Sequence, residues 1–456
     1  MAGIGFQLKK PLEKGTYLGL IEAYAYSGVI SSGPWVLSIL GILAISFLTV
    51  TAPNTRAAVL QFQVSATYLI AFSLILSGFL HLAFSRFVAD RLFERKDRLV
   101  LPNFLGAMYV TTVASGVTGI VCAQWLFAEQ SISYRLLMLS GFVILCNIWI
   151  ATLLLSGLKF YKGIVACFAL GYGLTVVGAL LLQHFGVEGL LTGFVLGQFV
   201  LLMGMMLLLL QHHQSDRLLA VDFLKRGQIY VSLLWVGFFY ASAIWIDKIL
   251  FWFYPATGYD VIGPLRASPV YDLPMFLAYL SILPGMAVYL LRIETDFVEY
   301  YKRFYDAVRD GGSLTKIEEM RNELVFAARQ GITEVIKVQS VAVLVGIVGG
   351  PWLWRQFGLG ELYLSLFYID LVSVGIQVVL LGLLNLFFYL DKRRTVVAIT
   401  LLFLLTNAGF TYVSLTLGVP FYGYGFALSL LLCVLVSMYL LDRSLNHLEY
   451  ETFMLQ

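Results

Sequence analysis

The sequence predicts an all-α integral membrane protein of about twelve transmembrane helices in two six-helix lobes, with both termini in the cytoplasm. Three observations lead to this fold class. Hydrophobic residues make up 60% of the chain and charged residues 12%, whereas soluble domains carry about 25% charged residues. Apolar runs of about 20 residues, long enough to cross the hydrocarbon core as helices, recur along the chain. Successive loops between these runs alternate between many and few Lys and Arg residues.

The first half of the chain is expected to hold spans 1 to 6. A basic amphipathic lead-in (1–24) precedes span 1 (25–50), which contains Gly33 and Pro34. Since proline removes a backbone donor and clashes one turn back, we expect a kink there. The next five spans are expected at 62–88, 103–127, 136–158, 163–182 and 189–210. Glycines open the last of these at intervals of four, which favours close helix packing: Gly189, Gly193 and Gly197.

The second half begins with span 7 (228–254), followed by an outer loop rich in Pro and Gly (255–268). Span 8 (271–291) carries Pro284 and Gly285, where we expect a second kink. The remaining spans are expected at 335–354, 362–390, 396–417 and 422–441. The domains predicted from this order are an N-terminal lobe, a cytoplasmic linker, a C-terminal lobe and a cytoplasmic tail: 1–210, 211–227, 228–442 and 443–456.

The positive charges fix the predicted orientation, because cytoplasmic loops carry the excess of Lys and Arg. Of the 30 Lys and Arg residues, 25 fall in alternate loops on the side of both termini. The other 5 are Arg56, Arg135, Lys248, Arg266 and Arg355. This split predicts twelve spans with both termini in the cytoplasm.

The longest extramembrane segment is predicted at 292–337, with amphipathic helices on either side of Gly311 and Gly312. Its first helix carries an aromatic stripe that includes Tyr301, Phe304 and Tyr305. Its second helix is expected to open with a capping box formed by Thr315 and Glu318. The stripe is either a docking surface for a cytoplasmic partner or an apolar face that rests on the bundle or bilayer.

Ionisable residues inside the spans are the candidates for the transport pathway, since such residues face a protein or aqueous interior. Asp247 and Lys248 lie side by side in span 7, near the aromatic residues Trp245 and Tyr240. Asp370 lies in span 10, with no basic neighbour in the sequence. These groups either line the path or act as neutralised structural partners. The buried polar residues His81, Asn147, Asn385 and Asn407 present the same two alternatives.

Enzymatic chemistry is not expected from this chain. It lacks a P-loop, an H-E-x-x-H helix and a G-x-S-x-G turn, and its outer loops are too short to gather a carboxylate site. The four cysteines fall inside apolar runs without metal-ligand spacing. We therefore expect neither cofactor nor metal, and no nucleic-acid partner.

Three short motifs together resemble the PelG family, the polytopic subunits of the bacterial Pel exopolysaccharide machinery: MAGIGF at 1–6, SSGPWVL at 31–37 and IWIDK at 244–248. The resemblance covers the whole chain. It implies a V-shaped flippase fold of the multidrug/oligosaccharidyl-lipid/polysaccharide (MOP) superfamily and inner-membrane transport of an N-acetylgalactosamine-rich polymer for the biofilm matrix. It also implies partners, namely a cytoplasmic PelF-like glycosyltransferase and inner-membrane PelD/PelE-like subunits, beside membrane lipids.

Two other functions stay open at this point. A cation-coupled antiporter or lipid-linked oligosaccharide flippase of the same fold would need an isolated carboxylate facing its cavity, for which Asp370 qualifies. A scaffold that assembles the synthase without conducting anything is the third possibility.

Overall fold

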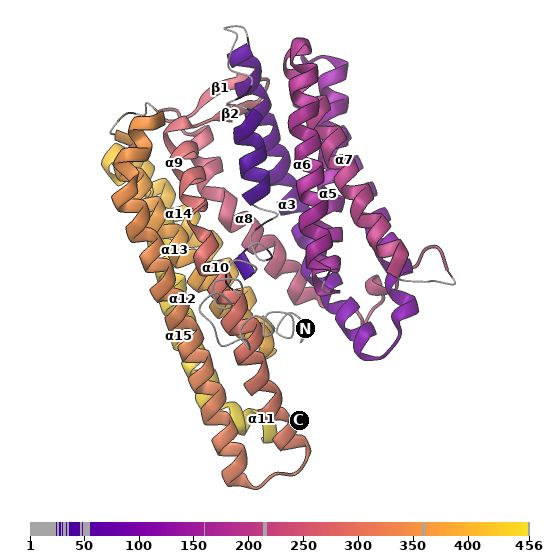
Figure 1. Cartoon of the computed structure of the whole chain (residues 1–456), viewed down its shortest axis with the longest axis vertical. Coiled ribbons are helices and arrows are strands. Elements are labelled where there is room, and N and C mark those ends of the chain that lie inside the picture. Colours follow the sequence, from indigo (N-terminus) through magenta and orange to yellow (C-terminus); the bar gives the residue numbers. More distant parts are fainter. Residues whose placement is uncertain are drawn as a thin grey trace. The chain divides into compact units, whose positions relative to one another are not determined.

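The computed structural model describes residues 24, 27–28, 30, 33, 36–45, 48, 55–158, 160–212, 217–357, 360 and 362–454. The chain divides into two compact units. We call Pro34–Ser268 the N-terminal unit, and Pro269–Gln456 together with Met1–Gly33 the C-terminal unit. Both are built almost entirely of helices, as the apolar runs predict (Figure 1).

The long helices of the N-terminal unit follow the expected spans closely. They are α3 (Thr55–Phe93), α4 (Val100–Trp125), α5 (Ile132–Gly157), α6 (Tyr161–Leu182), α7 (Gly186–His212) and α8 (Val231–Phe253). Helix α3 packs against α5 and α8, and α7 packs against α5 and α6 (Figure 1). Because α8 packs on α3, it belongs to this compact unit, although the sequence placed it in the C-terminal lobe. The expected lobe boundaries themselves stay a prediction.

Glycine allows the closest helix crossings of this unit. A Cβ atom on Gly237 of α8 would lie 2.1 Å from the carbonyl oxygen of Gly78 on α3. The expected close packing of span 6 is confirmed, since a Cβ on Gly193 would lie 2.4 Å from the backbone nitrogen of Ala179 on α6. Only glycine permits backbones to approach to these distances, so these positions fix how α8 and α7 pack.

The loop after α8, which the sequence assigns to the outer side, contains a hairpin that the sequence did not predict. Strands β1 (Tyr259–Ile262) and β2 (Leu265–Ala267) pair antiparallel across a turn in which Gly263 has a φ of +52°. Arg266 forms an ion pair with Asp260 at 2.9 Å and donates to the Gly258 carbonyl at 3.0 Å. The hydroxyl of Tyr68 on α3 donates to the Arg266 carbonyl at 3.0 Å, which ties the hairpin to the bundle.

The linker before α8 is bound to the start of α4. The Asn103 side chain, fully buried, accepts from the Asp222 amide at 2.7 Å and donates to the Asp222 carboxylate at 3.2 Å. Lys225 and Asn103 hold the pKa of the Asp222 carboxyl below its usual value, since both stabilise the charged form. The predicted inter-lobe linker is therefore ordered where the structure describes it.

The C-terminal unit begins with a broken helix and ends with a short terminal one. Its elements are α9 (Pro269–Tyr279), α10 (Ile282–Leu291), the π-helical η4 (Arg292–Phe297), α11 (Val298–Arg309), α12 (Leu314–Phe357), α13 (Leu362–Tyr389), α14 (Arg393–Leu417), α15 (Tyr424–Asn446) and α16 (Leu448–Met454). Helix α13 is central, since it packs against α9, α12 and α15.

Helices α11 and α12 form a long hairpin (Figure 1). The expected turn at Gly311 is confirmed, with a φ of +69°. The expected capping box is wrong: α12 begins at Leu314, and the Ser313 hydroxyl accepts from the Lys316 amide at 3.4 Å. Ser and Thr are both good caps, so local sequence could not choose between Ser313 and Thr315.

Ion pairs connect the N-terminal half of α12 to α15, to α16 and, through α16, to the turn after α13. Arg329 pairs with Asp442 of α15 at 2.6 Å, and Arg321 pairs with Glu449 of α16 at 3.1 Å. Lys392, in the turn between α13 and α14, pairs with Glu451 of α16. The second half of the segment expected to be extramembrane (314–337) is thus continuous with expected span 9 in helix α12. Ion pairs with α15 and α16 hold it in place.

Nine helical stretches among the described residues are long and apolar enough to cross a membrane, and the bent pair that begins with α9 and α10 raises this number to ten. One stretch, Tyr161–Gln211, contains both α6 and α7. Expected span 1 is described only in part, mainly as the apolar helix Val36–Ile45. The count of twelve spans stays a prediction.

Candidate functional site

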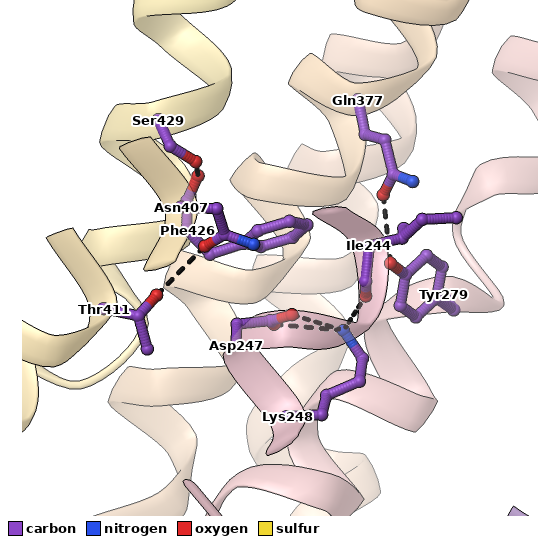
Figure 2. Close-up of polar contacts among 9 residues, drawn as sticks. All are labelled: Ile244, Asp247, Lys248, Tyr279, Gln377, Asn407, Thr411, Phe426 and Ser429. Carbon is purple, nitrogen blue, oxygen red and sulfur yellow. Dashed lines mark hydrogen bonds and ion pairs between the residues drawn. The ribbon is translucent and has the colours of Figure 1, made fainter. Parts of the chain in front are cut away.

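The adjacent charges of α8 form a buried ion pair inside the N-terminal unit. Lys248 Nζ lies 3.0 Å from Asp247 Oδ2 and 3.3 Å from Oδ1, and it donates to the Ile244 carbonyl at 3.0 Å (Figure 2). Adjacent residues of a helix project in different directions. Lys248 therefore has to curl back along its own helix to reach both the carboxylate and the carbonyl one turn earlier. The Asp247 side chain is fully buried, and Lys248 is 7% exposed.

Aromatic rings lie beside this pair, as the sequence suggested. Lys248 Nζ is 5.8 Å from the ring centroid of Trp245, within the range of a cation–π contact. The Trp245 ring packs on Trp252 at 6.3 Å, and Trp252 stacks on Tyr68 of α3 at 4.5 Å. Tyr240 lies seven residues before Asp247 and is half-buried, which places both on one face of α8. The α8 site thus combines a paired charge with a wall of rings.

The second feature is the break between α9 and α10, where the helical stretches Pro269–Tyr279 and Ile282–Arg309 are bent by 41°. Pro284 was expected to cause a kink, and the bend lies one turn earlier, at Leu280 and Ser281. Proline clashes with the carbonyl four residues before it, which here is that of Leu280. The amides of Leu280 and Ser281 donate instead to carbonyls three residues back, at 3.2 and 3.0 Å. The bend lies one turn before Pro284 and Gly285, where the sequence predicts a kink, and a gating role of these two residues stays a prediction.

A side chain that the sequence did not single out occupies this break. The Gly285 amide donates to Gln339 Oε1 at 3.1 Å, and Gln339 Nε2 donates to the Ser281 carbonyl at 3.1 Å. In an unbroken helix the Gly285 amide would donate directly to the Ser281 carbonyl. The carboxamide of Gln339, from α12, is thus inserted into the hydrogen-bond ladder and satisfies both groups. Insertion of a side chain into the ladder is a recognised cause of helix kinks.

Two glycines make room for this inserted carboxamide. A Cβ atom on Gly285 would lie 2.3 Å from Gln339 Oε1, and one on Gly375 of α13 would lie 3.3 Å from Gln339 Cγ. Gln339 is only 2% exposed. On the other side of the break, the Tyr279 hydroxyl donates to Gln377 Oε1 of α13 at 3.0 Å (Figure 2). The bend is therefore specified by polar groups from two neighbouring helices.

Asp370 lies on α13 and is fully buried. A Cβ atom on Gly423, just before α15, would lie 3.3 Å from Asp370 Oδ1. The carboxyl group thus lies at the N-terminal end of α15, where backbone amides favour negative charge. A role of this carboxyl group in the transport pathway stays a prediction.

Other polar residues in the spans form hydrogen bonds within their own units. Asn147 donates to Thr112 at 2.9 Å, and Asn385 donates to Tyr289 at 2.7 Å and to Glu294 at 2.8 Å. The Thr411 hydroxyl donates to Asn407 Oδ1 at 3.0 Å (Figure 2). These contacts favour the structural interpretation for the three asparagines.

The aromatic stripe proposed for partner docking packs inside the C-terminal unit. Phe304 is fully buried. The Tyr301 ring lies 5.8 Å from that of Tyr389 on α13 and 4.6 Å from that of Tyr305. These contacts favour the interpretation in which the stripe rests on the bundle. Tyr301 and Tyr305 remain partly exposed, so docking at their edges stays a prediction.

The first expected kink cannot be placed in the same way. Gly33 is helical, and Pro34 lies outside the described residues. The break that the structure does describe is therefore the one in span 8.

Comparison with known proteins identifies the family and the fold. The family model PelG, described as "Putative exopolysaccharide Exporter (EPS-E)", matches residues 1–453. No curated relative matches the chain at the sequence level. Similar solved structures include an outward-facing multidrug resistance MATE family transporter of the MOP superfamily, with 15% identity, a TM-score of 0.64 and coverage of 93% of this chain and 96% of that chain.

Two further structures have the same fold. MATE in its bent conformation is 15% identical, with a TM-score of 0.66 and coverage of 94% of this chain and 96% of that chain. A MOP superfamily transporter from Pyrococcus furiosus is 15% identical, with a TM-score of 0.62 and coverage of 93% and 96%. The expected fold class is thereby confirmed: the chain belongs to the PelG family of exopolysaccharide exporters and has the fold of MOP superfamily transporters.

Proposed function

We propose that this chain moves an N-acetylgalactosamine-rich exopolysaccharide across the bacterial inner membrane, as the membrane subunit of a synthase and transport complex for the biofilm matrix. The observation that carries the proposal is the family match over nearly the whole chain. We assign the buried pair on α8 to the transport pathway, because ionisable residues inside membrane spans usually mark such pathways.

The broken helix α9–α10 is the element that we propose to move during transport. Helices that change between straight and bent need partners for the backbone groups released by the bend. Gln339 supplies both partners in the bent form, and direct pairing of Gly285 with Ser281 would supply them in a straight form. The hinge therefore has two arrangements in which the Gly285 amide and the Ser281 carbonyl are both satisfied.

The alternative is cation-coupled transport of a small molecule or a lipid-linked oligosaccharide, and the position of Asp370 favours it. Reconstitution in liposomes with the partner glycosyltransferase tests the proposal. A conduit moves polymer, an antiporter moves a dye against a proton gradient, and a scaffold moves neither. Asp370→Asn keeps the shape of the side chain but cannot titrate, so an antiporter should lose coupling while remaining folded. Polymer transport unchanged by Asp370→Asn would remove this carboxyl group from the mechanism.

The orientation is proposed from the charge distribution, with both termini cytoplasmic. A cysteine introduced within 255–268 should react from outside the cell with an impermeant thiol reagent. Ser313→Cys, exposed in the turn between α11 and α12, should react only after the membrane is opened. The opposite labelling pattern would reverse the assignment of sides.

Docking of the cytoplasmic glycosyltransferase at the α11–α12 hairpin is proposed from its partly exposed tyrosine edges. Replacing Tyr301 and Tyr305 with Ser should reduce recovery of the PelF-like partner in pull-downs. Phe304→Leu is the matched control, since Phe304 is fully buried and Leu keeps the core apolar. Equal recovery from all variants would leave the stripe with a packing role alone.

A further inference from the structure

A polar pocket of about 300 Å³ lies between the π-helical turn and helix α12 in the C-terminal unit. Seven residues line it: Arg292, Asp296, Glu299, Tyr300, Ala327, Gln330 and Gly331. It lies at the end of the unit that the positive charges assign to the cytoplasm. None of the features described above uses this pocket.

The pocket is formed by the π turn η4 on one side and by small residues of α12 on the other. Ala327 and Gly331 lie four apart on α12, so that side of the pocket has almost no side-chain bulk. A Cβ atom on Gly331 would only reach ordinary contact with Arg292, at 3.6 Å. On the other side, η4 is a wide π turn, which offsets Arg292 and Asp296 from their positions in a regular α-helix. Such turns often occur at functional sites.

Ion pairs hold the polar groups of the pocket in place. Arg292 pairs with Asp296 at 2.7 Å and also with Glu334 of α12. Gln330 Nε2 donates to the same Glu334 at 3.2 Å. The guanidinium is thus fixed between two carboxylates, while each carboxylate keeps lone pairs that can accept further hydrogen bonds. A preorganised set of acceptors loses little conformational entropy when a ligand binds.

The charge of the pocket selects the class of ligand. Three carboxylates, those of Asp296, Glu299 and Glu334, face only two guanidiniums: Arg292 pairs with Asp296 and Glu334, and Arg303 pairs with Glu299 at 2.5 Å. A phosphate or nucleotide would therefore meet net negative charge, and a purely apolar chain would leave these polar groups unpaired. A neutral ligand with many hydroxyl donors satisfies the carboxylates through charge-assisted hydrogen bonds.

The Tyr300 ring completes a surface suited to a sugar. It lines the pocket and is half-buried, with the Arg303 guanidinium 5.4 Å from its centroid. A pyranose ring has apolar C–H groups on its faces and hydroxyl donors at its edge. It can therefore pack on Tyr300 while its hydroxyls reach the Asp296 carboxylate. We propose that this pocket, the α11–α12 pocket, binds one sugar ring of the exported polymer on the cytoplasmic side. The proposal rests on the proposed function, since it concerns the same substrate.

Cysteine protection tests the pocket directly in the full-length protein. In a Cys122→Ser background the three remaining native cysteines are buried, so an introduced Gln330→Cys is the reactive thiol. An N-acetylgalactosamine tetrasaccharide at about twice its Kd should slow alkylation about threefold, because the occupied fraction is shielded. Glu319→Cys, exposed on α12 outside the pocket, should react at an unchanged rate. Inorganic phosphate should slow neither.

Matched variants separate ring stacking from a general loss of structure. Tyr300→Phe should keep the protection of Gln330→Cys, and Tyr300→Leu should abolish it while thermal unfolding stays unchanged. Absence of protection in the Tyr300-intact protein, or equal protection of Glu319→Cys, would overturn the proposal. If the protein exports polymer but the tetrasaccharide does not slow alkylation of Gln330→Cys, only the proposal about the pocket is refuted. Protection without export in liposomes keeps the pocket and refutes the proposed function.

Discussion

Gln339→Met should abolish most polymer export, because it removes both groups that satisfy the break between α9 and α10. Methionine has a similar length and shape but neither donates nor accepts strongly. If the bend is kept, the Gly285 amide and the Ser281 carbonyl are buried without partners, at a cost of about 1–3 kcal/mol each. If they pair with each other instead, the helix straightens as far as Pro284 permits and the bent arrangement is lost.

Spin labels distinguish these two results. Pro269 and Lys302 are exposed near the two ends of the broken helix. Straightening a 41° bend should lengthen their separation by about 3 Å, from the rise of about 1.5 Å per residue. We expect Gln339→Met to show either this longer distance or a lower unfolding temperature, with reduced export in both cases. A variant unchanged in distance, stability and export would leave Gln339 without a role in the hinge.

Two further changes serve as controls. Gln339→Glu, in its protonated form, still offers one donor and one acceptor and should retain much of the export. Gly285→Ala places a Cβ atom 2.3 Å from Gln339 Oε1 and should displace the carboxamide. Both substitutions disrupt the same hydrogen bond between Gly285 and Gln339. The double variant Gly285→Ala/Gln339→Met should therefore reduce export no more than either single variant.

The hinge also shows what the sequence could and could not predict. The bend followed from Pro284, because the clash of proline with the preceding turn is local. Gln339 lies 54 residues away along the chain from Gly285, and its carboxamide has meaning only once α12 packs on α10. The only local hint in the sequence was that Gln339 is the single glutamine of an expected span that is largely apolar. Helix bounds were predictable for a similar reason, since apolar length and turn residues are local properties.

The remaining differences have the same cause. The hairpin β1–β2 is stabilised by Tyr68, far away in the sequence, and its short strands carry no clear alternation. The packing of α8 on α3 depends on Gly78 meeting Gly237, a coincidence of two distant glycines. The buried pair of α8 could be predicted because its members are adjacent in the chain. Its cation–π contact with Trp245 likewise depends on neighbouring residues of one helix.

The second large effect is expected at the α8 pair. Asp247→Asn alone leaves the Lys248 ammonium without its carboxylate, and Lys248→Gln alone leaves the Asp247 carboxylate in a fully buried position. Removing one member of a buried ion pair typically destabilises by about 3–5 kcal/mol. Each single variant should therefore reach the membrane in much smaller amounts. The double variant Asp247→Asn/Lys248→Gln contains no stranded charge and should accumulate like the unmodified protein.

Secreted polymer per unit of inserted protein then assigns the role of the pair. We expect the double variant to insert normally and to export poorly, because it removes both charges of an intramembrane ionisable pair, and such pairs usually mark a transport pathway. Trp245→Phe provides a comparison that keeps an aromatic ring while both charges remain. Recovery of export together with insertion in the double variant would contradict a pathway role, since the only defect of the single variants would then be the charge each leaves unpaired in the interior of α8.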